Sequence, residues 1–209
     1  DNVDYWITPE TDGSSSALIN TDGPQFGSVH TTTADLTNRD AVTYASPVLT
    51  HPMQVQTTGE NTENVLAVGI VKHPQFSTVA DVTTEGLSSG DPYYDTGTWT
   101  GEVTLSSGAA ELLSATSGDD LDIIRPAAGR EHNFSVAAVD TGNTTGSQFP
   151  IVVMQLSELQ AITGADTNDE ADQIVVSSTD PSIESALTDL YPESSVSTRA
   201  GLNAQAVLE

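Results

Sequence analysis

Acidic side chains dominate this sequence and restrict the kind of fold that it can adopt. Thirty aspartates and glutamates stand against five lysines and arginines, which gives a formal net charge of −25. The carboxylates are scattered singly through segments that also carry apolar residues, whereas disordered acidic tails have blocks of like charge and few apolar residues. Because 36% of the 209 residues are hydrophobic, the chain can build a core. The pattern therefore predicts one folded domain, or two small ones, with an acidic surface.

High salt is the simplest physical reason for such a surface. At about 1 M salt the Debye length falls to about 3 Å, so repulsion among carboxylates is largely screened. Lys72 is the single lysine, which also fits a surface with few exposed aliphatic stems. The sequence thus favours a halophile protein, with an ordinary acidic protein as the alternative. The same charge excludes nucleic acid as a natural partner, because phosphate backbones are bound by clustered lysine and arginine.

Two features that the sequence lacks narrow the class of protein further. There is no cysteine, so disulfides, thiolate metal sites and thiol catalysis are excluded. No apolar run approaches the roughly 18 residues of a membrane-spanning helix. The longest runs, such as residues 151–154, have the length of core strands. We therefore expect a chain that does not cross a membrane itself and that is a piece of a larger protein.

Hydrophobic periodicity predicts an α+β fold with many short strands and a few short helices. Strands are expected at residues 3–7, 53–56, 65–71, 102–105, 121–124, 134–139, 151–154, 174–176 and 196–199. Helices are expected near residues 33–36, from Ser106 or Ser107 to about Ala115, from Ser157 to Gly164, and after Pro181. The second of these helices is predicted to bury Ala109, Leu112 and Leu113. Residues 77–97 have few apolar anchors and are predicted to form a long surface excursion.

Two Asp-Thr-Gly triplets, which begin at Asp95 and Asp140, suggest the paired loops of an aspartic protease. Such enzymes need matched halves that bring two carboxylates to about 3 Å, where they share one proton. Here the triplets lie close together in the sequence, and only Asp140 follows an apolar strand. Since Asp-Thr-Gly is also ordinary turn chemistry, we favour two turns and predict that the chain is not an enzyme.

The histidines and the acidic segment 166–172 do not form a metal signature. His30, His51, His73 and His132 lack the i, i+4 spacing of a metal-binding pair on a helix, and we expect exposed loop side chains. The acidic segment alternates oxygen-bearing side chains as a calcium loop does, but it lacks the central glycine and the distal glutamate. A solvated loop is the favoured interpretation, and weak cation binding is left open.

No catalytic sequence motif is present. The chain contains no Gly-x-Ser-x-Gly, no Walker loop and no Gly-x-Gly-x-x-Gly. We therefore predict no catalytic residue, no cofactor-binding residue, no metal ligand and no cofactor. Asn133 and Asn143 begin Asn-x-Ser/Thr sequons, which are compatible with an exterior location. The sequence does not decide whether either asparagine carries a glycan.

Three segments follow one another in the middle of the chain. They read Gly-Glu-Val-Thr-Leu-Ser-Ser-Gly-Ala-Ala-Glu-Leu-Leu from Gly101, Ser-Gly-Asp-Asp-Leu-Asp-Ile from Ser117, and Phe-Ser-Val-Ala-Ala-Val from Phe134. These segments resemble the extracytoplasmic domain of MacB/FtsX-type ABC transporter permeases. The family has Gly-Glu-Val-Val-Leu with a short helix ending in leucine, then Val-Gly-Asp-x-Leu-x-Leu and Phe-x-Val-Val-Gly-Ile. Ala138 departs from the family, which usually has glycine there. Further landmarks follow in the family's order at residues 40–47, 65–70, 151–160 and 171–176, so the resemblance covers about residues 3–200.

The resemblance implies an architecture with two subdomains. A mixed α/β "porter-like" subdomain would be built from both chain ends, residues 1–52 and 165–209. An inserted, mostly β "sabre-like" subdomain would comprise residues 53–164. The two ends of the chain should then lie side by side, because in this family the domain connects two neighbouring membrane helices.

The resemblance also implies a function outside the membrane. Such a domain is non-catalytic, stands on the extracellular face of the cell membrane, and transmits ATP-driven motion or engages substrate or partner there. Its partners would be its own flanking transmembrane helices, a cytoplasmic ABC ATPase subunit acting indirectly, and a possible second permease copy. A free-standing cell-surface adhesion or ligand-binding domain of a halophile is the alternative. The transported substrate and the oligomeric state are not predicted.

Overall fold

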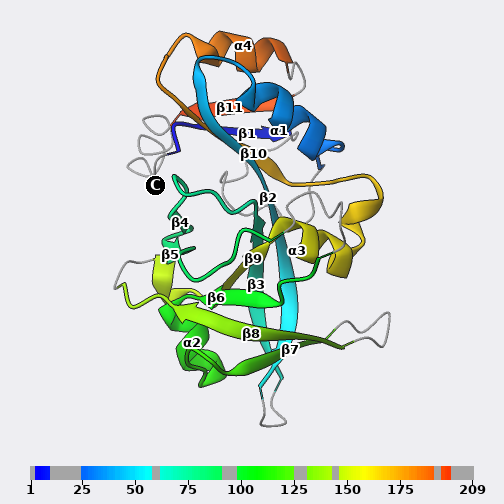
Figure 1. Cartoon of the computed structure of the whole chain (residues 1–209), viewed down its shortest axis with the longest axis vertical. Helices are drawn as coiled ribbons and strands as arrows, with labels where there is room; N and C mark the ends of the chain where they lie inside the picture. The colour runs from blue at the N-terminus through cyan, green and yellow to red at the C-terminus, as the bar shows by residue number, and fades with distance from the viewer. Residues whose placement is uncertain are drawn as a thin grey trace. The chain divides into compact units, whose positions relative to one another are not determined.

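The computed structural model describes residues 3–9, 25–57, 62–90, 98–124, 131–142, 146–190 and 194–198. The chain divides into two compact units. The inserted unit comprises Thr50–Gly164, and the end-strand unit comprises Asn2–Leu49 together with Ala165–Glu209. Figure 1 shows both units in the colours of the sequence, and each is described by itself below.

The end-strand unit is built on an antiparallel sheet that joins the two ends of the sequence. Its strand order is β11 (Ser194–Thr198), β1 (Tyr5–Pro9), β10 (Gln173–Ser178) and the first part of β2 (Val42–Gln56). Tyr5 pairs with Val176 on one side and with Thr198 on the other. The first strand therefore has a hydrogen-bonded neighbour along both of its edges, and one of these neighbours is the last described strand.

Two helices complete this unit, α1 (Val29–Thr37) and α4 (Ile183–Leu190). They contribute Leu36 from α1 and Ile183 with Leu187 from α4 to a single apolar cluster. The strands contribute alternate residues, as expected for side chains that share one face of a sheet. These strand residues are Tyr5, Ile7, Val42, Ala45, Ile174 and Val176. Both helices therefore cover the same face of the sheet.

The inserted unit is a closed barrel of mixed strand direction. Its order is β2, β3 (Thr62–Ile70), β9 (Ile151–Gln155), β6 (Glu102–Leu105), β8 (Glu131–Val139) and β7 (Asp120–Ile124), and β7 pairs again with β2. Closure is antiparallel, with Val55 of β2 opposite Ile123 of β7. A closed barrel leaves no free sheet edge, so every strand satisfies its backbone groups from both sides.

Helices α2 (Ser107–Leu113) and α3 (Leu156–Thr163) belong to the inserted unit. Ser106 caps α2 as predicted, since its Oγ accepts from Ala109 N at 3.0 Å. The predicted cap of α3 is wrong, because Gln155 is the N-cap and Ser157 is buried at the second position of the helix. Strand β9 ends at Gln155 and α3 begins at Leu156, so the chain passes from strand to helix without an exposed polar turn. Gly164 ends α3 with φ 89°, as predicted.

Two further predictions from the sequence need correction. Residues near Pro47 and Met53 lie in one continuous strand, β2, because the register passes unbroken through Pro47, opposite Ile174 of β10. Residues 77–97 were predicted to form a surface excursion, but the described part, 77–90, is packed rather than loose, since it forms the hairpin of β4 (Thr78–Val79) and β5 (Val82–Thr83). Residues 91–97 lie outside the described residues. Its apolar anchors Phe76, Val79, Val82 and Leu87 are buried.

The single lysine explains how this packed segment is held. Lys72 Nζ donates to Thr84 O at 2.5 Å and to Thr84 Oγ1 at 3.0 Å. Thr84 is fully buried, and its hydroxyl donates to Phe76 O at 2.6 Å. Burial lowers the pKa of Lys72, and the nearby charge of Glu85 acts in the opposite direction. The lysine is thus an internal donor of the fold. Among the helices of the described residues, none is long and apolar enough to cross a membrane.

Candidate functional site

Asp140, the described member of the two Asp-Thr-Gly triplets, has a structural use. It follows β8, where its Oδ2 accepts from Thr83 N at 2.7 Å and its Oδ1 accepts from Gly142 N at 2.6 Å. Both oxygens are therefore engaged in holding a turn and the β5 hairpin. Asp95 lies outside the described residues. The geometry around Asp140 is that of a turn, as the sequence suggested.

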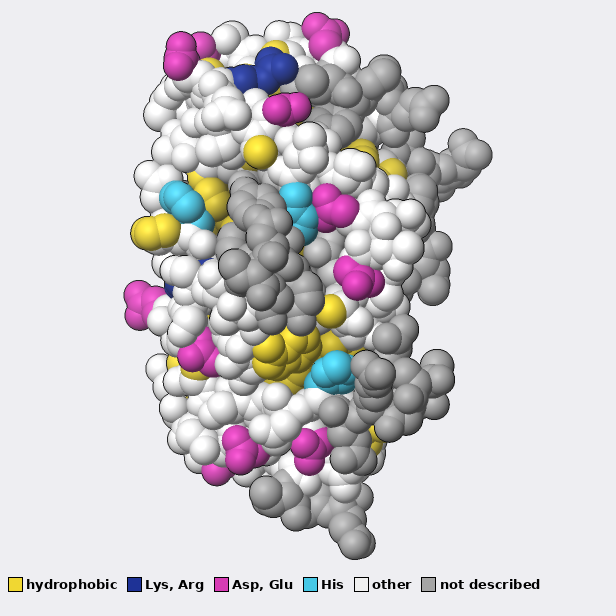
Figure 2. Space-filling view, turned by 45° about the vertical axis from the view of Figure 1, so that its right-hand side comes forward, with side chains coloured by type: hydrophobic (Ala, Val, Ile, Leu, Met, Phe, Trp, Pro, Cys, Tyr) yellow, Lys and Arg dark blue, Asp and Glu magenta, His cyan; other side chains and the backbone are white. Residues whose placement is uncertain are grey.

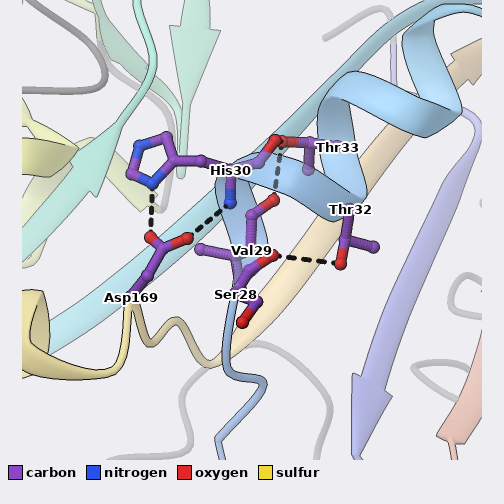
Figure 3. Close-up of polar contacts among 6 residues, drawn as sticks. All are labelled: Ser28, Val29, His30, Thr32, Thr33 and Asp169. Carbon is purple, nitrogen blue, oxygen red and sulfur yellow. Dashed lines mark hydrogen bonds and ion pairs between the residues drawn. The ribbon is translucent and has the colours of Figure 1, made fainter. Parts of the chain in front are cut away.

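The acidic segment 166–172 holds the start of helix α1 (Figure 3). Asp169 Oδ2 accepts from His30 N at 2.9 Å, and Asp169 Oδ1 contacts His30 Nδ1. Ser28, the N-cap residue, is in the left-handed region with φ 53° and makes no side-chain cap bond. The carboxylate of Asp169 therefore does what a capping side chain would do, since it satisfies a free N–H of the first turn and complements the helix dipole.

Asp172, near the end of the same acidic segment, also holds a residue that is distant in the sequence. Asp172 is buried, and its Oδ1 accepts from Gln25 Nε2 at 2.8 Å. Phe26 and Ala171 form a short antiparallel bridge beside it. Across the described ranges no group of three or more histidine, cysteine, aspartate or glutamate side chains could hold a metal ion. The expectation of a solvated loop is wrong for Asp169 and Asp172. Their carboxylates accept hydrogen bonds from His30 and Gln25, which are distant in the sequence.

The expectation of exposed loop histidines holds only in part. His30 lies on α1 with its side chain 15% exposed, and His51 is exposed but lies on strand β2. His132 lies on β8 and stacks on Trp99, with ring centroids 5.4 Å apart and 27° between the planes. His73 lies in a loop as expected but is half-buried; its Nδ1 accepts from Gln75 N at 3.2 Å, and burial lowers the pKa of His73.

Asn133 has the exposure that a modified asparagine needs. It lies on β8 with an exposed side chain, and its Nδ2 donates to Asp122 Oδ1 at 3.2 Å. Asn143 lies outside the described residues. The described sequon is thus accessible in the folded barrel, which is compatible with an exterior location.

Two large apolar side chains of the inserted unit are exposed. Phe149 is 62% exposed and Leu112 is 41% exposed. The prediction that Leu112 is buried is wrong, because α2 has two turns and its buried stripe runs through Ala109 and Leu113. Gly108 lets α2 sit tightly on the segment before Phe149, since a Cβ there would lie 2.0 Å from Gln148 O. An exposed aromatic side chain on an acidic protein is a candidate contact for a partner.

The acidic surface predicted from the sequence is visible in Figure 2. Aspartate and glutamate side chains lie singly over this face, and lysine and arginine cover little of it. The carboxylates are not gathered into one patch there. On this face the negative charge is therefore spread out and does not mark a single binding patch.

The paired end strands are the feature with the clearest mechanical meaning. β1 and β11 are in register over five residue pairs, from Tyr5 with Thr198 to Pro9 with Ser194. Since the strands are antiparallel, the chain before Tyr5 and the chain after Thr198 leave from the same end of this ladder. The prediction that the two ends lie side by side is confirmed for the described strands. This arrangement suits a domain inserted between two neighbouring segments of a larger protein.

The fold is that of the MacB-type extracytoplasmic domain, which confirms the expected fold class. No protein-family model matches the chain, and no curated protein matches it. Three solved structures are similar to it. The periplasmic region of MacB from Actinobacillus actinomycetemcomitans has a TM-score of 0.66 at 14% identity, covering 98% of this chain and 94% of that one.

The other two structures come from different bacteria. The extracellular domain of the noncanonic ABC-type transporter YknZ from Gram-positive bacteria has a TM-score of 0.59 at 13% identity, covering 94% of this chain and 99% of that one. A domain of a putative permease protein from Porphyromonas gingivalis has a TM-score of 0.52 at 13% identity, covering 94% and 91%. Identities this low establish a shared fold and nothing finer.

Proposed function

We propose that this chain is the extracellular domain of an ABC transporter permease, and that it transmits ATP-driven motion without catalysing a reaction. In this proposal the domain stands on the outer face of the cell membrane. Its own flanking helices anchor it, and a cytoplasmic ATPase subunit drives it indirectly. A second permease copy is a further proposed partner.

The observation that carries the proposal is the extent of the likeness to MacB. It covers 98% of this chain and 94% of the MacB periplasmic region. A similarity limited to one motif would support a shared local structure only. This similarity extends over nearly the whole of both chains, so it supports a shared domain. Because a fold hosts many functions, the functional step remains a proposal.

The register of β1 and β11 supports a mechanical role. Movement of two flanking helices would reach the domain through two adjacent strands, one ending at Tyr5 and the other at Thr198. β1 also pairs with β10, so force applied to it spreads to a strand on each side. Slipping this ladder by one residue would turn buried Tyr5 and Ile7 away from their cluster. The sheet should therefore move as a stiff body.

We assign the two compact units to the two subdomains that the resemblance implies. The end-strand unit would be porter-like and the inserted unit, Thr50–Gly164, would be sabre-like. Phe149 and Leu112 would then offer an apolar contact to a partner or substrate from the inserted unit.

The test uses the full-length protein in membranes with its ATPase. The chain has no cysteine, so spin labels can be placed at exposed Asp35 of α1 and exposed Ser117 of the inserted unit. Pulsed EPR should show a distance distribution that changes between the nucleotide-free and the vanadate-trapped state. A control pair within one unit, Asp35 and Thr179, should give the same distribution in both states.

Two outcomes would contradict the proposal. A full-length protein without apolar segments on both sides of this chain would instead favour the adhesion or ligand-binding alternative. The second outcome is a distance distribution that does not change with nucleotide in a preparation that hydrolyses ATP. It would contradict the transmission of motion, and it would leave the permease assignment open.

A further inference from the structure

Glu158 is an acidic side chain that the fold withdraws from water. It lies in the first turn of α3 and is 1% exposed. Its Oε1 accepts from Thr100 N, from Thr100 Oγ1 at 2.7 Å and from Gly101 N at 3.3 Å. All three donors thus point at one oxygen of the carboxyl group, which leaves the other oxygen to be accounted for.

That second oxygen, Glu158 Oε2, is buried without a hydrogen-bond partner among the described residues. The same is true of Oε1 of Gln155, the N-cap residue, which is also 1% exposed. The amide Nε2 of Gln155 is already committed, since it donates to Ser88 O. Two acceptor oxygens cannot bond to each other, and buried polar atoms are almost always paired. One hydrogen between them would satisfy both.

The two side chains reach the same place in the inserted unit. Gln155 is the N-cap of α3 and Glu158 is the third residue of that helix, so both side chains leave from its first turn. A Cβ built on Gly90 would lie 2.9 Å from Thr100 Cγ2 and 3.3 Å from Gln155 Cδ. Thr100, which is bonded to Glu158, and the amide of Gln155 therefore both lie beside Gly90.

The electrostatics of the place favour a neutral carboxyl group. Burial raises the pKa of Glu158 most, the hydrogen bonds from Thr100 and Gly101 lower it, and the charge of Glu102 raises it again, with a net rise. Glu102 lies beside the same segment, where its two oxygens accept from Ser88 N at 2.6 Å and Ser88 Oγ at 2.9 Å. The negative charge of Glu102 thus repels an ionised Glu158 and disfavours that form.

We propose that Glu158 is a neutral carboxylic acid in the folded domain, with Oε2–H donated to Oε1 of Gln155, and that it acts as a proton-linked latch on Thr100 and Gly101. The proton is held at pH values at which an ordinary exposed carboxylate is ionised. When Glu158 does ionise, the unsolvated charge favours local opening of the latch, so that the carboxylate reaches water. The proposal does not depend on the transporter function.

A proton fits this place better than a metal ion does. Calcium takes about six to eight oxygen ligands, and the described residues contain no group of three or more candidate ligand side chains. A methyl group at Gly90 would already lie 2.9 Å from Thr100. A proton needs no space and no further ligands.

The test is the titration of individual glutamates in the intact domain by carbon NMR. The carboxyl resonance of Glu158 is assigned by its loss in Glu158→Gln. We expect the titration midpoint of Glu158 above the ordinary value of a glutamate in a model peptide. Glu102→Gln should lower the midpoint of Glu158, because it removes the repulsive charge. A midpoint of Glu158 at or below that ordinary value would overturn the proposal.

Hydrogen exchange tests the latch itself. Protection of the Thr100 and Gly101 amides should fall in the wild type as pH rises through the midpoint of Glu158, and should stay level in Glu158→Gln. Equal protection profiles in both proteins would refute the latch. A saturable thermal stabilisation by Ca²⁺ or Na⁺, present in the wild type and absent in Glu158→Gln, would show a bound cation instead of the proton. If Glu158→Gln does not fold, the carboxyl resonance of Glu158 is assigned by through-bond correlation to its own backbone, and the shift of its midpoint in Glu102→Gln still decides between the outcomes.

Discussion

Tyr5 and Thr198 are opposite one another in a single antiparallel register, at the outer end of the β1–β11 ladder. Almost the whole sequence lies between these two residues, yet their strands are neighbours in one sheet. The pairing makes the first and last strands of the described chain one structural element. A load applied at either end of the chain is therefore shared by both strands.

This register predicts which engineered disulfide can form. Thr8 and Ser195 are opposite partners, and Thr8→Cys with Ser195→Cys places the only two thiols in the chain at cross-strand distance. We expect rapid oxidation and a gain of about 2–5 kcal/mol in the free energy of unfolding, because the closed loop is long. Thiol titration and denaturant melts measure both. Thr8→Cys with Ser197→Cys, shifted by two residues, is the control, and equal crosslinking of the two pairs would show that the register is wrong.

The clamp between Asp169 and α1 predicts a local loss of stability. Asp169→Ala removes the acceptor for His30 N, and we expect the free energy of unfolding to fall by about 1–2 kcal/mol. Asp169→Asn keeps an acceptor oxygen and should cost less. Exposed Asp166→Ala is the matched control. Calcium should not shift the melting temperature, and a stabilisation by calcium that Asp169→Ala abolishes would make the loop a cation site after all.

The single lysine is predicted to be more sensitive to replacement than an exposed basic residue. Lys72→Met removes the charged donor from buried Thr84 O and leaves it only the longer bond from Leu87 N at 3.2 Å, so we expect a loss of about 1–3 kcal/mol. Exposed Arg39→Gln should change stability by no more than about 0.5 kcal/mol. Urea melts of the two variants in high salt compare them. Similar melts would mean that the Lys72 contact contributes nothing in solution.

Two phenylalanines of the inserted unit should behave in opposite ways. Phe134 is fully buried and Phe149 is 62% exposed. We expect Phe134→Ala to cost about 3–5 kcal/mol through cavity formation, and Phe149→Ala to stay within about 0.5 kcal/mol of the wild type. Thermal and urea melts measure both. A large loss in Phe149→Ala would place this side chain in the core and remove it as a partner contact.

Salt should stabilise the domain. At about 0.01 M salt the Debye length is about 30 Å, so the carboxylates repel one another across the surface, and this repulsion is screened as salt rises. We expect the melting temperature to increase steadily from about 0.1 to about 3 M KCl. A variant in which several exposed acids, including Glu111 and Asp120, are replaced by their amides should depend on salt less steeply. A flat profile in the wild type would contradict adaptation to high salt.

Local signals in the sequence predicted the elements whose reasons are local. Alternating apolar residues marked the strands around Val103 and Ile123, and a short apolar run marked the strand around Val153, because such local patterns need no distant partner to be recognised. Ser106 was recognised as a helix cap and Gly164 as a helix stop for the same reason. The charge of −25 also predicted the acidic surface directly.

The features that give the molecule its functional character were decided by tertiary structure. Nothing near Glu158 in the sequence shows that it is buried, and nothing near His30 shows that Asp169 will hold it. Lys72 and Thr84 likewise meet only after β4 and β5 fold back between them. Hydrogen bonds and burial depend on groups that chain folding brings from far away, whereas periodicity and caps depend on neighbours. The sequence by itself therefore determined the strands and the charge, and the closed barrel and the pairing of Tyr5 with Thr198 were decided only when distant backbone groups had to find partners.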